Sequence, residues 1–111
     1  INPNDTFSLF NLGILHAKDE NYLDAIQAFD NVIQLEPDHA RAWYMKGVVF
    51  SKLERFIDAI SAFNKAIEID PDYEKAREKK AFLNNNLPKI NNMIPFSNFP
   101  ITLNKNSPDR V

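Results

Sequence analysis

The chain has 111 residues, 44% of them hydrophobic and 25% charged, which is the composition of one soluble domain. Its formal net charge of −2 gives no basic surplus, so neither nucleic acid nor an anionic membrane surface is expected as a partner. The chain has no cysteine, which excludes a disulfide framework and a zinc knuckle and suits the reducing cytoplasm, and no apolar run is long enough to span a membrane.

An internal duplication dominates the sequence. Residues 40–73, moved back by 34 places onto residues 6–39, are identical at eleven of the 34 positions. A period of this length is the signature of a repeat array in which each unit is one helix pair. The sequence therefore predicts an all-α fold, an antiparallel helix-pair solenoid. The identical pairs are Gly13/Gly47, Lys18/Lys52, Glu20/Glu54, Asp24/Asp58, Ala25/Ala59, Ile26/Ile60, Ala28/Ala62, Phe29/Phe63, Ile33/Ile67, Pro37/Pro71 and Asp38/Asp72.

The first unit predicts two helices, over about residues 6–18 and 22–35. Apolar residues cover a wide arc of the first helix, which indicates burial against neighbours on two sides. In the second helix, Ala25, Ala28 and Phe29 fall at the spacing of one helical face. Small alanines beside a large phenylalanine are typical of close helix packing, since the alanines admit the neighbouring helix and the ring fills the gap.

The second unit repeats this pair near residues 40–53 and 56–69. A fifth helix is predicted over about residues 73–87, with Pro88 ending it. Its face is mostly charged, as the terminal cap of a solenoid requires. Prolines close each unit, and the residues that follow them, Asn4, Asp38 and Asp72, are placed to cap the next helix.

Residues 88–111 have a different composition. Four prolines and five asparagines in this segment exclude a regular helix, yet its isoleucines and phenylalanines make it too apolar for a solvated linker. We expect an extended, Pro-rich tail that rests on another surface. The predicted domain organisation is thus a repeat domain over residues 1–87 and a tail over residues 88–111.

The two units resemble the tetratricopeptide repeat, a helix-turn-helix motif with the same period. The second unit carries the family's signature residues except at Lys46, where the family has leucine. In the first unit His16 replaces an aromatic residue and Val32 an alanine. The resemblance covers residues 1 to about 87 and implies two repeats, at about 6–39 and 40–73, followed by a capping helix. The residues at the signature places are Leu9, Leu12, Gly13, His16, Ala25, Phe29, Val32 and Pro37, then Trp43, Gly47, Phe50, Ala59, Phe63, Ala66 and Pro71.

The resemblance also implies a site. In this family the first helix of each pair lines a concave groove that receives an extended peptide or a helix. The corresponding residues here are aromatic or aliphatic with Lys and Arg around them, and Phe7, Phe10, Tyr44 and Met45 are expected to be exposed. The implied groove residues are Phe7, Phe10, Asn11, Ile14, Lys18, Arg41, Tyr44, Met45, Val48, Lys52, Lys75, Lys79 and Phe82.

One subgroup of the family grips the C-terminal aspartate of chaperone tails with a carboxylate clamp of five polar or basic residues. This chain has Phe10, Ile14 and Met45 at three of those places, and only Lys75 and Lys79 match. Chaperone-tail capture is therefore not the expected activity.

The sequence has few residues arranged for metal binding, phosphate binding or catalysis. His16, Asp19 and Glu20 have spacing that a metal site can use, but His16 is better explained as filling an aromatic slot between helices. The basic residues of the fifth helix alternate with glutamates, as in a solvated face with ion pairs. With two glycines the chain has no phosphate-binding loop, and it has no nucleophile–base pairing. We expect no catalysis, no cofactor and no metal.

The sequence leaves two functions open. The first is a protein–protein interaction module whose groove binds an extended or helical segment with apolar and some acidic character. The alternative is self-association, in which the tail docks on the repeats of the same or a second copy and gives a homodimer.

Overall fold

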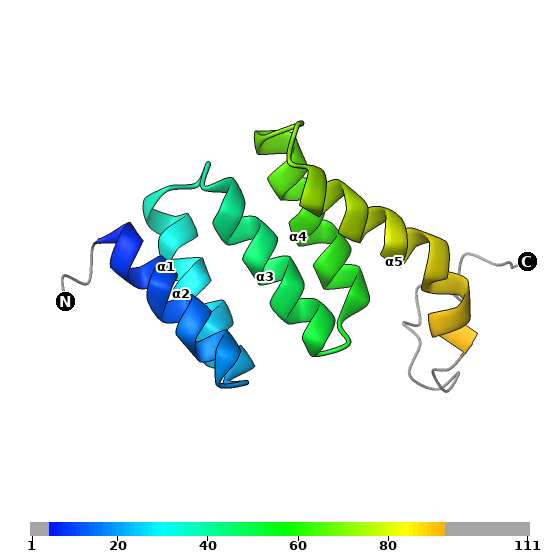
Figure 1. Ribbon diagram of the computed structural model, residues 1–111, viewed down its shortest axis with the longest axis horizontal. Helices are drawn as coiled ribbons and strands as arrows, with labels where there is room; N and C mark the ends of the chain where they lie inside the picture. The colour runs from blue at the N-terminus through cyan, green and yellow to red at the C-terminus, as the bar shows by residue number, and fades with distance from the viewer. Residues whose placement is uncertain (1–4, 93–111) are drawn as a thin grey trace, which may run out of the picture.

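Five antiparallel helices follow one another across the molecule (Figure 1). The computed structural model describes residues 5–92, and the side chains of residues 5–87. The all-α helix-pair solenoid predicted from the sequence is confirmed. The helices are α1 (Thr6–Lys18), α2 (Tyr22–Leu35), α3 (Ala40–Lys52), α4 (Phe56–Ile69) and α5 (Glu74–Asn92).

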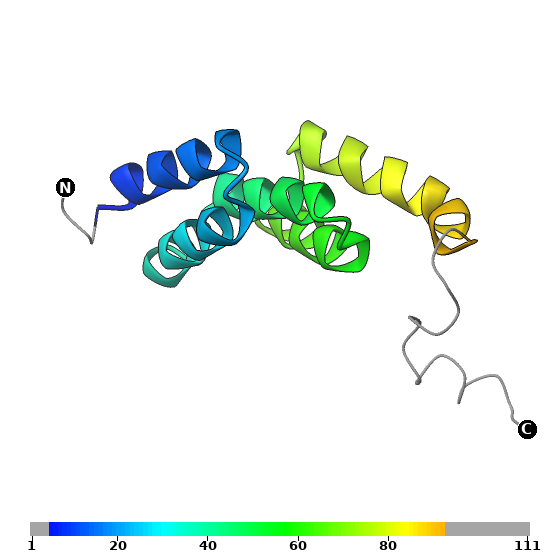
Figure 2. The same cartoon turned by 90° about the horizontal axis from the view of Figure 1, so that it is seen from below.

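The helices form two layers (Figure 2). In that view α1, α3 and α5 lie on one side and α2 and α4 lie beneath them, with α1 and α5 rising on either side of α3. Each second helix of a pair packs on the helix before it and on the helix after it. One core cluster accordingly joins α1, α2 and α3, and another joins α3, α4 and α5.

The spacing of alanine and phenylalanine explains this packing. On α2 the residues Ala25, Ala28, Phe29 and Val32 are buried, and on α4 their counterparts Ala59, Ala62, Phe63 and Ala66 are buried. Each phenylalanine ring lies against a glycine of the preceding helix. A Cβ atom added to Gly13 or Gly47 would lie 2.6 Å from the ring of Phe29 or Phe63. Glycine is therefore required at both positions for the helices to approach this closely.

The turn within each pair contains a glutamate in the left-handed region. Glu20 has φ 63° and Glu54 has φ 61°. An L-residue adopts this conformation at a cost of roughly 1–2 kcal/mol, because its Cβ approaches the backbone. The two repeats therefore share one turn geometry, and both place a strained residue in it.

Two helix caps differ from the prediction. Asp5 caps α1, its carboxylate accepting a hydrogen bond from the Phe7 backbone N–H at 3.0 Å. His39 rather than Asp38 caps α3, with Nδ1 accepting from the Ala42 N–H at 3.1 Å. In this hydrogen bond the acceptor nitrogen, Nδ1 of His39, carries no proton.

The prediction that Pro88 ends the fifth helix is wrong, because α5 continues to Asn92. Proline removes one N–H and presses on the carbonyl four residues earlier, here that of Asn84. Asn84 is exposed, so water can reach that carbonyl and the lost hydrogen bond leaves no buried unpaired group. The extended tail expected over residues 88–111 lies, from Met93 onward, outside the described residues, as does any docking of it on the repeats.

No helix among residues 5–92 has both the length and the apolar character that crossing a bilayer would need.

Candidate functional site

The groove residues expected from the sequence lie on α1, α3 and α5, the three helices of one layer (Figure 2). We call the surface formed by these residues the A-helix face. Eight of them are exposed in the structure, and Ile14, Met45 and Val48 are half-buried. The exposed ones are Phe7, Asn11, Lys18, Arg41, Lys52, Lys75, Lys79 and Phe82.

The expectation that Phe10 and Tyr44 are exposed is wrong. Phe10 is 6% exposed and Tyr44 is 9% exposed, and each belongs to a core cluster. Both rings pack against the phenylalanine of the next helix, with centroids 5.6 Å apart for Phe10–Phe29 and for Tyr44–Phe63. These two rings therefore form the floor of the A-helix face.

A third ring packs on each of these two ring pairs, and the sequence pattern did not predict it. His39 stacks on Phe10 with ring centroids 5.2 Å apart, and Tyr73 stacks on Tyr44 at 5.1 Å. His39 and Tyr73 are themselves separated by one repeat period, so an aromatic pair at that period was the signal that could have revealed them. Each repeat thus builds the same three-ring cluster at its junction with the next helix.

Arg41 lies over the first cluster. Its guanidinium carbon is 4.8 Å from the centroid of Phe10, within the range of a cation–π contact. The guanidinium also lies beside the Tyr73 hydroxyl: burial raises the pKa of Tyr73, and Arg41 opposes that rise. Arg41 therefore connects the first cluster to the second.

A hollow of about 540 Å³ lies beside the second cluster, between α3 and α5. It is lined by Tyr44, Lys75, Glu78, Lys79 and Phe82. Burial, and secondarily the Glu78 carboxylate, raise the pKa of Tyr44. The hollow thus offers a phenol, two ammonium groups, one carboxylate and an aromatic side chain that is 65% exposed.

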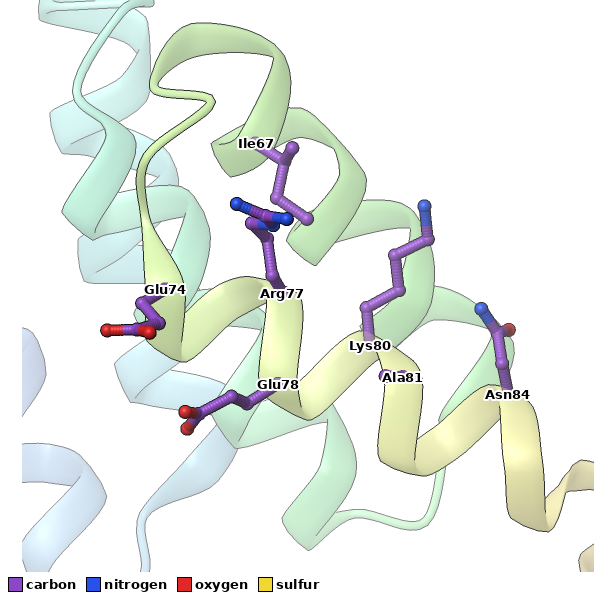
Figure 3. Close-up of a pocket in the computed structure, with 7 residues that line it drawn as sticks. All are labelled: Ile67, Glu74, Arg77, Glu78, Lys80, Ala81 and Asn84. Carbon is purple, nitrogen blue, oxygen red and sulfur yellow. The ribbon is translucent and has the colours of Figure 1, made fainter.

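A second hollow, of about 570 Å³, lies at the end of the described array, between α4 and α5 (Figure 3). Arg77, Lys80 and Asn84 project from α5 on the side of Ile67, whereas Glu74 and Glu78 point away from them. The counterparts of Arg77 and Asn84 one repeat earlier are Trp43 and Phe50, which pack in the second core cluster. This polar surface has the character expected of a capping helix, and it contains none of the predicted groove residues.

Lys46, which stands where the family has leucine, is explained by its surroundings. Its ammonium group is 2.6 Å from a carboxylate oxygen of Asp30 on α2 and 5.2 Å from the centroid of Trp43. The indole Nε1–H of Trp43 donates to the carbonyl oxygen of Pro37 at 3.1 Å. The aliphatic part of Lys46 thus replaces leucine as packing surface while its charge is paired.

His16, the candidate metal residue, is half-buried on α1. No group of three His, Cys, Asp or Glu side chains that could hold a metal ion occurs within residues 5–87.

The profile of one family, described as the tetratricopeptide repeat, matches residues 10–74, more than half of the chain. The chain belongs to the tetratricopeptide repeat family. This is a family of non-catalytic repeat domains that generally act as protein–protein interaction modules. A sequence search of the curated proteins finds no match.

Several solved structures resemble this fold. The crystal structure of MamA superposes with a TM-score of 0.76 at 23% identity, over 78% of this chain and 51% of MamA. The TPR2B domain of yeast Sti1, solved as a complex with pHsp70, gives 0.71 at 26% identity over 76% and 67%. A Salinibacter ruber tetratricopeptide repeat protein gives 0.59 at 24% over 85% and 94%. This chain spans about half the length of MamA.

Proposed function

We propose that the A-helix face binds an extended or helical segment of a protein partner, and that this segment is apolar with acidic side chains. The observation that carries the proposal is the distribution of charge. The chain as a whole has a net charge of −2. Yet the charged residues among the predicted groove residues are five cations, Lys18, Arg41, Lys52, Lys75 and Lys79, and the one carboxylate beside them in the hollow is that of Glu78.

Exposed apolar side chains support the same proposal. Phe7 is 72% exposed and Phe82 is 65% exposed, at opposite ends of the A-helix face. An exposed phenylalanine that borders a hollow, as Phe82 does, gains by covering its ring with a partner side chain. Opposite charge then steers the partner and fixes its orientation.

The Sti1 domain supports a protein as the class of ligand, since it was solved in complex with pHsp70. The carboxylate clamp does not carry over, because only Lys75 and Lys79 occupy its places and Phe10, Ile14 and Met45 occupy the others. We therefore propose an internal acidic and apolar segment as ligand, not a chaperone tail.

The test compares two adjacent lysines of α5. Lys79 lines the hollow of the A-helix face, whereas Lys80 lines the hollow at the end of the array. Fluorescently labelled synthetic peptides of acidic–apolar, basic–apolar and uncharged–apolar composition are titrated with the protein and followed by anisotropy. We expect the acidic–apolar peptides to bind best, Lys79→Glu to weaken them about tenfold, and Lys80→Glu to change affinity less than twofold.

Equal losses in Lys79→Glu and Lys80→Glu would contradict the proposal, because a non-specific charge effect would explain them. Tyr44→Glu is unsuitable as a test of the A-helix face. Tyr44 is 9% exposed, so a carboxylate there would disrupt the core as well as the surface.

A further inference from the structure

One edge of the molecule carries the turn within each repeat and the C-terminal end of α5 (Figure 1). We call it the turn edge. Four large aliphatic side chains follow one another across it: Leu87 from α5, Ile57 from α4, Leu53 at the end of α3 and Leu23 from α2. Leu23 is 71% exposed and its counterpart one repeat later, Ile57, is 67% exposed, whereas Leu53 and Leu87 are half-buried. Both repeats thus leave apolar surface open to solvent at this edge.

A hollow of about 400 Å³ lies at the end of the turn edge that is farthest from α5. It is lined by Glu20, Asn21, Tyr22, Leu23, Asp24 and Leu53. Among these described residues two are carboxylates and none is a cation. In the second repeat Arg55 is 2.7 Å from Asp58, but in the first repeat Asn21 stands at the place of Arg55. The hollow is therefore both apolar and negatively charged.

The charge of the two turns differs in the same direction. Residues 18–24 carry three carboxylates and one ammonium group, whereas residues 52–58 carry two charges of each sign. Along the turn edge, from α5 toward α2, a surface of nearly neutral and apolar character thus gives way to one that is apolar and acidic. A segment that covers the whole edge needs apolar side chains first and basic side chains last.

The part of this chain that follows α5 has that chemistry in that order. Residues 93–104 contain no charged residue, and they include the large apolar side chains of Phe96, Phe99 and Ile101. Residues 105–111 then carry two cations and one carboxylate side chain. The A-helix face is the less suitable surface for this segment, because its own charged groove residues are cations.

We propose that residues 93–111 fold back along the turn edge of their own chain, cover Ile57 and Leu23, and place Lys105 and Arg110 near the hollow. Because α5 ends at Asn92 on this edge, the segment starts where the row of aliphatic side chains starts. An extended chain of 19 residues spans up to about 63 Å, and the longest dimension of the molecule is 55 Å, so the hollow is within reach. Covalent attachment gives the segment a local concentration of the order of millimolar, so a weak contact is sufficient.

The experiment locates the tail by NMR in the whole chain. Because the chain has no cysteine, Ser107→Cys provides a single attachment site for a nitroxide spin label. We expect paramagnetic broadening of the amide signals of residues 20–24 to be several times larger than that of residues 36–39, which form the turn between the repeats on the opposite edge (Figure 1). Broadening that is equal at the two edges, or that is centred on the A-helix face, would overturn the proposal.

Two pairs of variants test which side chains hold the tail. Leu23→Ser removes an exposed apolar side chain of the turn edge, and Leu35→Ser removes one that is 44% exposed at the other end of α2. Chymotrypsin cleavage after Phe96 and Phe99 is expected to become roughly five to ten times faster in Leu23→Ser, because the undocked fraction rises, and to stay unchanged in Leu35→Ser. Asp24→Asn is expected to act in the same direction, with Asp38→Asn on the opposite edge as its control. Equal cleavage rates within each pair would contradict the assignment.

A mixed sample distinguishes the tail of the same chain from that of a second copy. Spin-labelled chain without isotope is mixed with ¹⁵N-labelled chain that lacks the label. We expect no broadening in this mixture and a monomer in sedimentation velocity. Broadening of residues 20–24 in the mixture would overturn docking within one chain, because the tail would then be exchanged between copies. The proposed function of the A-helix face rests on other residues and is unaffected by any of these outcomes.

Discussion

Replacement of Phe63 by alanine tests the packing on which the array depends. Phe63 is fully buried and lies against the Tyr44 ring and Gly47. Its neighbours on the same helix face, Ala59 and Ala66, are too small to fill the space that the ring would leave. We therefore expect the free energy of unfolding to fall by about 3–5 kcal/mol, the range for removing a buried aromatic ring.

The assay is urea unfolding followed by far-ultraviolet circular dichroism. With a denaturant slope of about 2 kcal/mol per molar urea, a loss of this size lowers the midpoint by about 1.5–2.5 M. Because a domain of this size has a total stability of only about 5–15 kcal/mol, Phe63→Leu provides a milder variant whose midpoint stays measurable.

The matched control is Phe82→Ala, which removes the same ring from a position that is 65% exposed. This control is expected to change stability by no more than about 0.5 kcal/mol. A loss below about 1 kcal/mol in Phe63→Ala, or equal losses in the two variants, would refute the assignment of Phe63 to the core.

Three further substitutions test local features. Glu54→Gly relieves the left-handed backbone at φ 61° and is expected to raise the free energy of unfolding by about 0.5–1 kcal/mol in urea titrations. Asp30→Asn leaves the Lys46 ammonium without its partner and is expected to lower stability by about 1 kcal/mol, a loss that Lys46→Leu in the same chain should recover. His39→Phe keeps the aromatic ring but loses the hydrogen bond to the Ala42 N–H, so thermal unfolding should show a loss of about 1 kcal/mol, whereas His39→Asn retains a cap.

Each of these predictions has a contradicting result. Asp19→Gly is the control for the turn, because Asp19 has an ordinary φ of −84°. If Asp19→Gly and Glu54→Gly raised the free energy of unfolding equally, backbone strain at Glu54 would not be the cause. A double variant no more stable than Asp30→Asn alone would mean that the ion pair does not explain Lys46. A His39→Phe variant as stable as the parent chain would show that the cap contributes nothing.

The period in the sequence was sufficient to predict the fold. Identical glycines, alanines and phenylalanines recur at that period, and the structure pairs Gly13 with Phe29 and Gly47 with Phe63 as the pattern requires. The end of α5 was not predicted, because a proline disfavours a helix interior and the sequence alone does not show that this helix continues past Pro88. Asn84, four residues before Pro88, is exposed.

The candidate site was less predictable than the fold. A helical wheel puts Phe10 and Tyr44 on the surface of α1 and α3, but it does not show that His39 and Tyr73 arrive from the following junction and cover them. Burial of a side chain by residues distant in sequence depends on tertiary structure. The cations Arg41, Lys75 and Lys79 were easier to place, since charged side chains stay exposed in almost any packing.

The most direct test of the proposed function is an NMR titration of the whole chain with an acidic–apolar peptide. Binding on the A-helix face predicts shifts of the amide signals concentrated at α1, α3 and α5, with the largest near Arg41, Lys75 and Phe82. Shifts centred on Arg77 and Lys80 at the end of the array, or spread over α2 and α4, would contradict it.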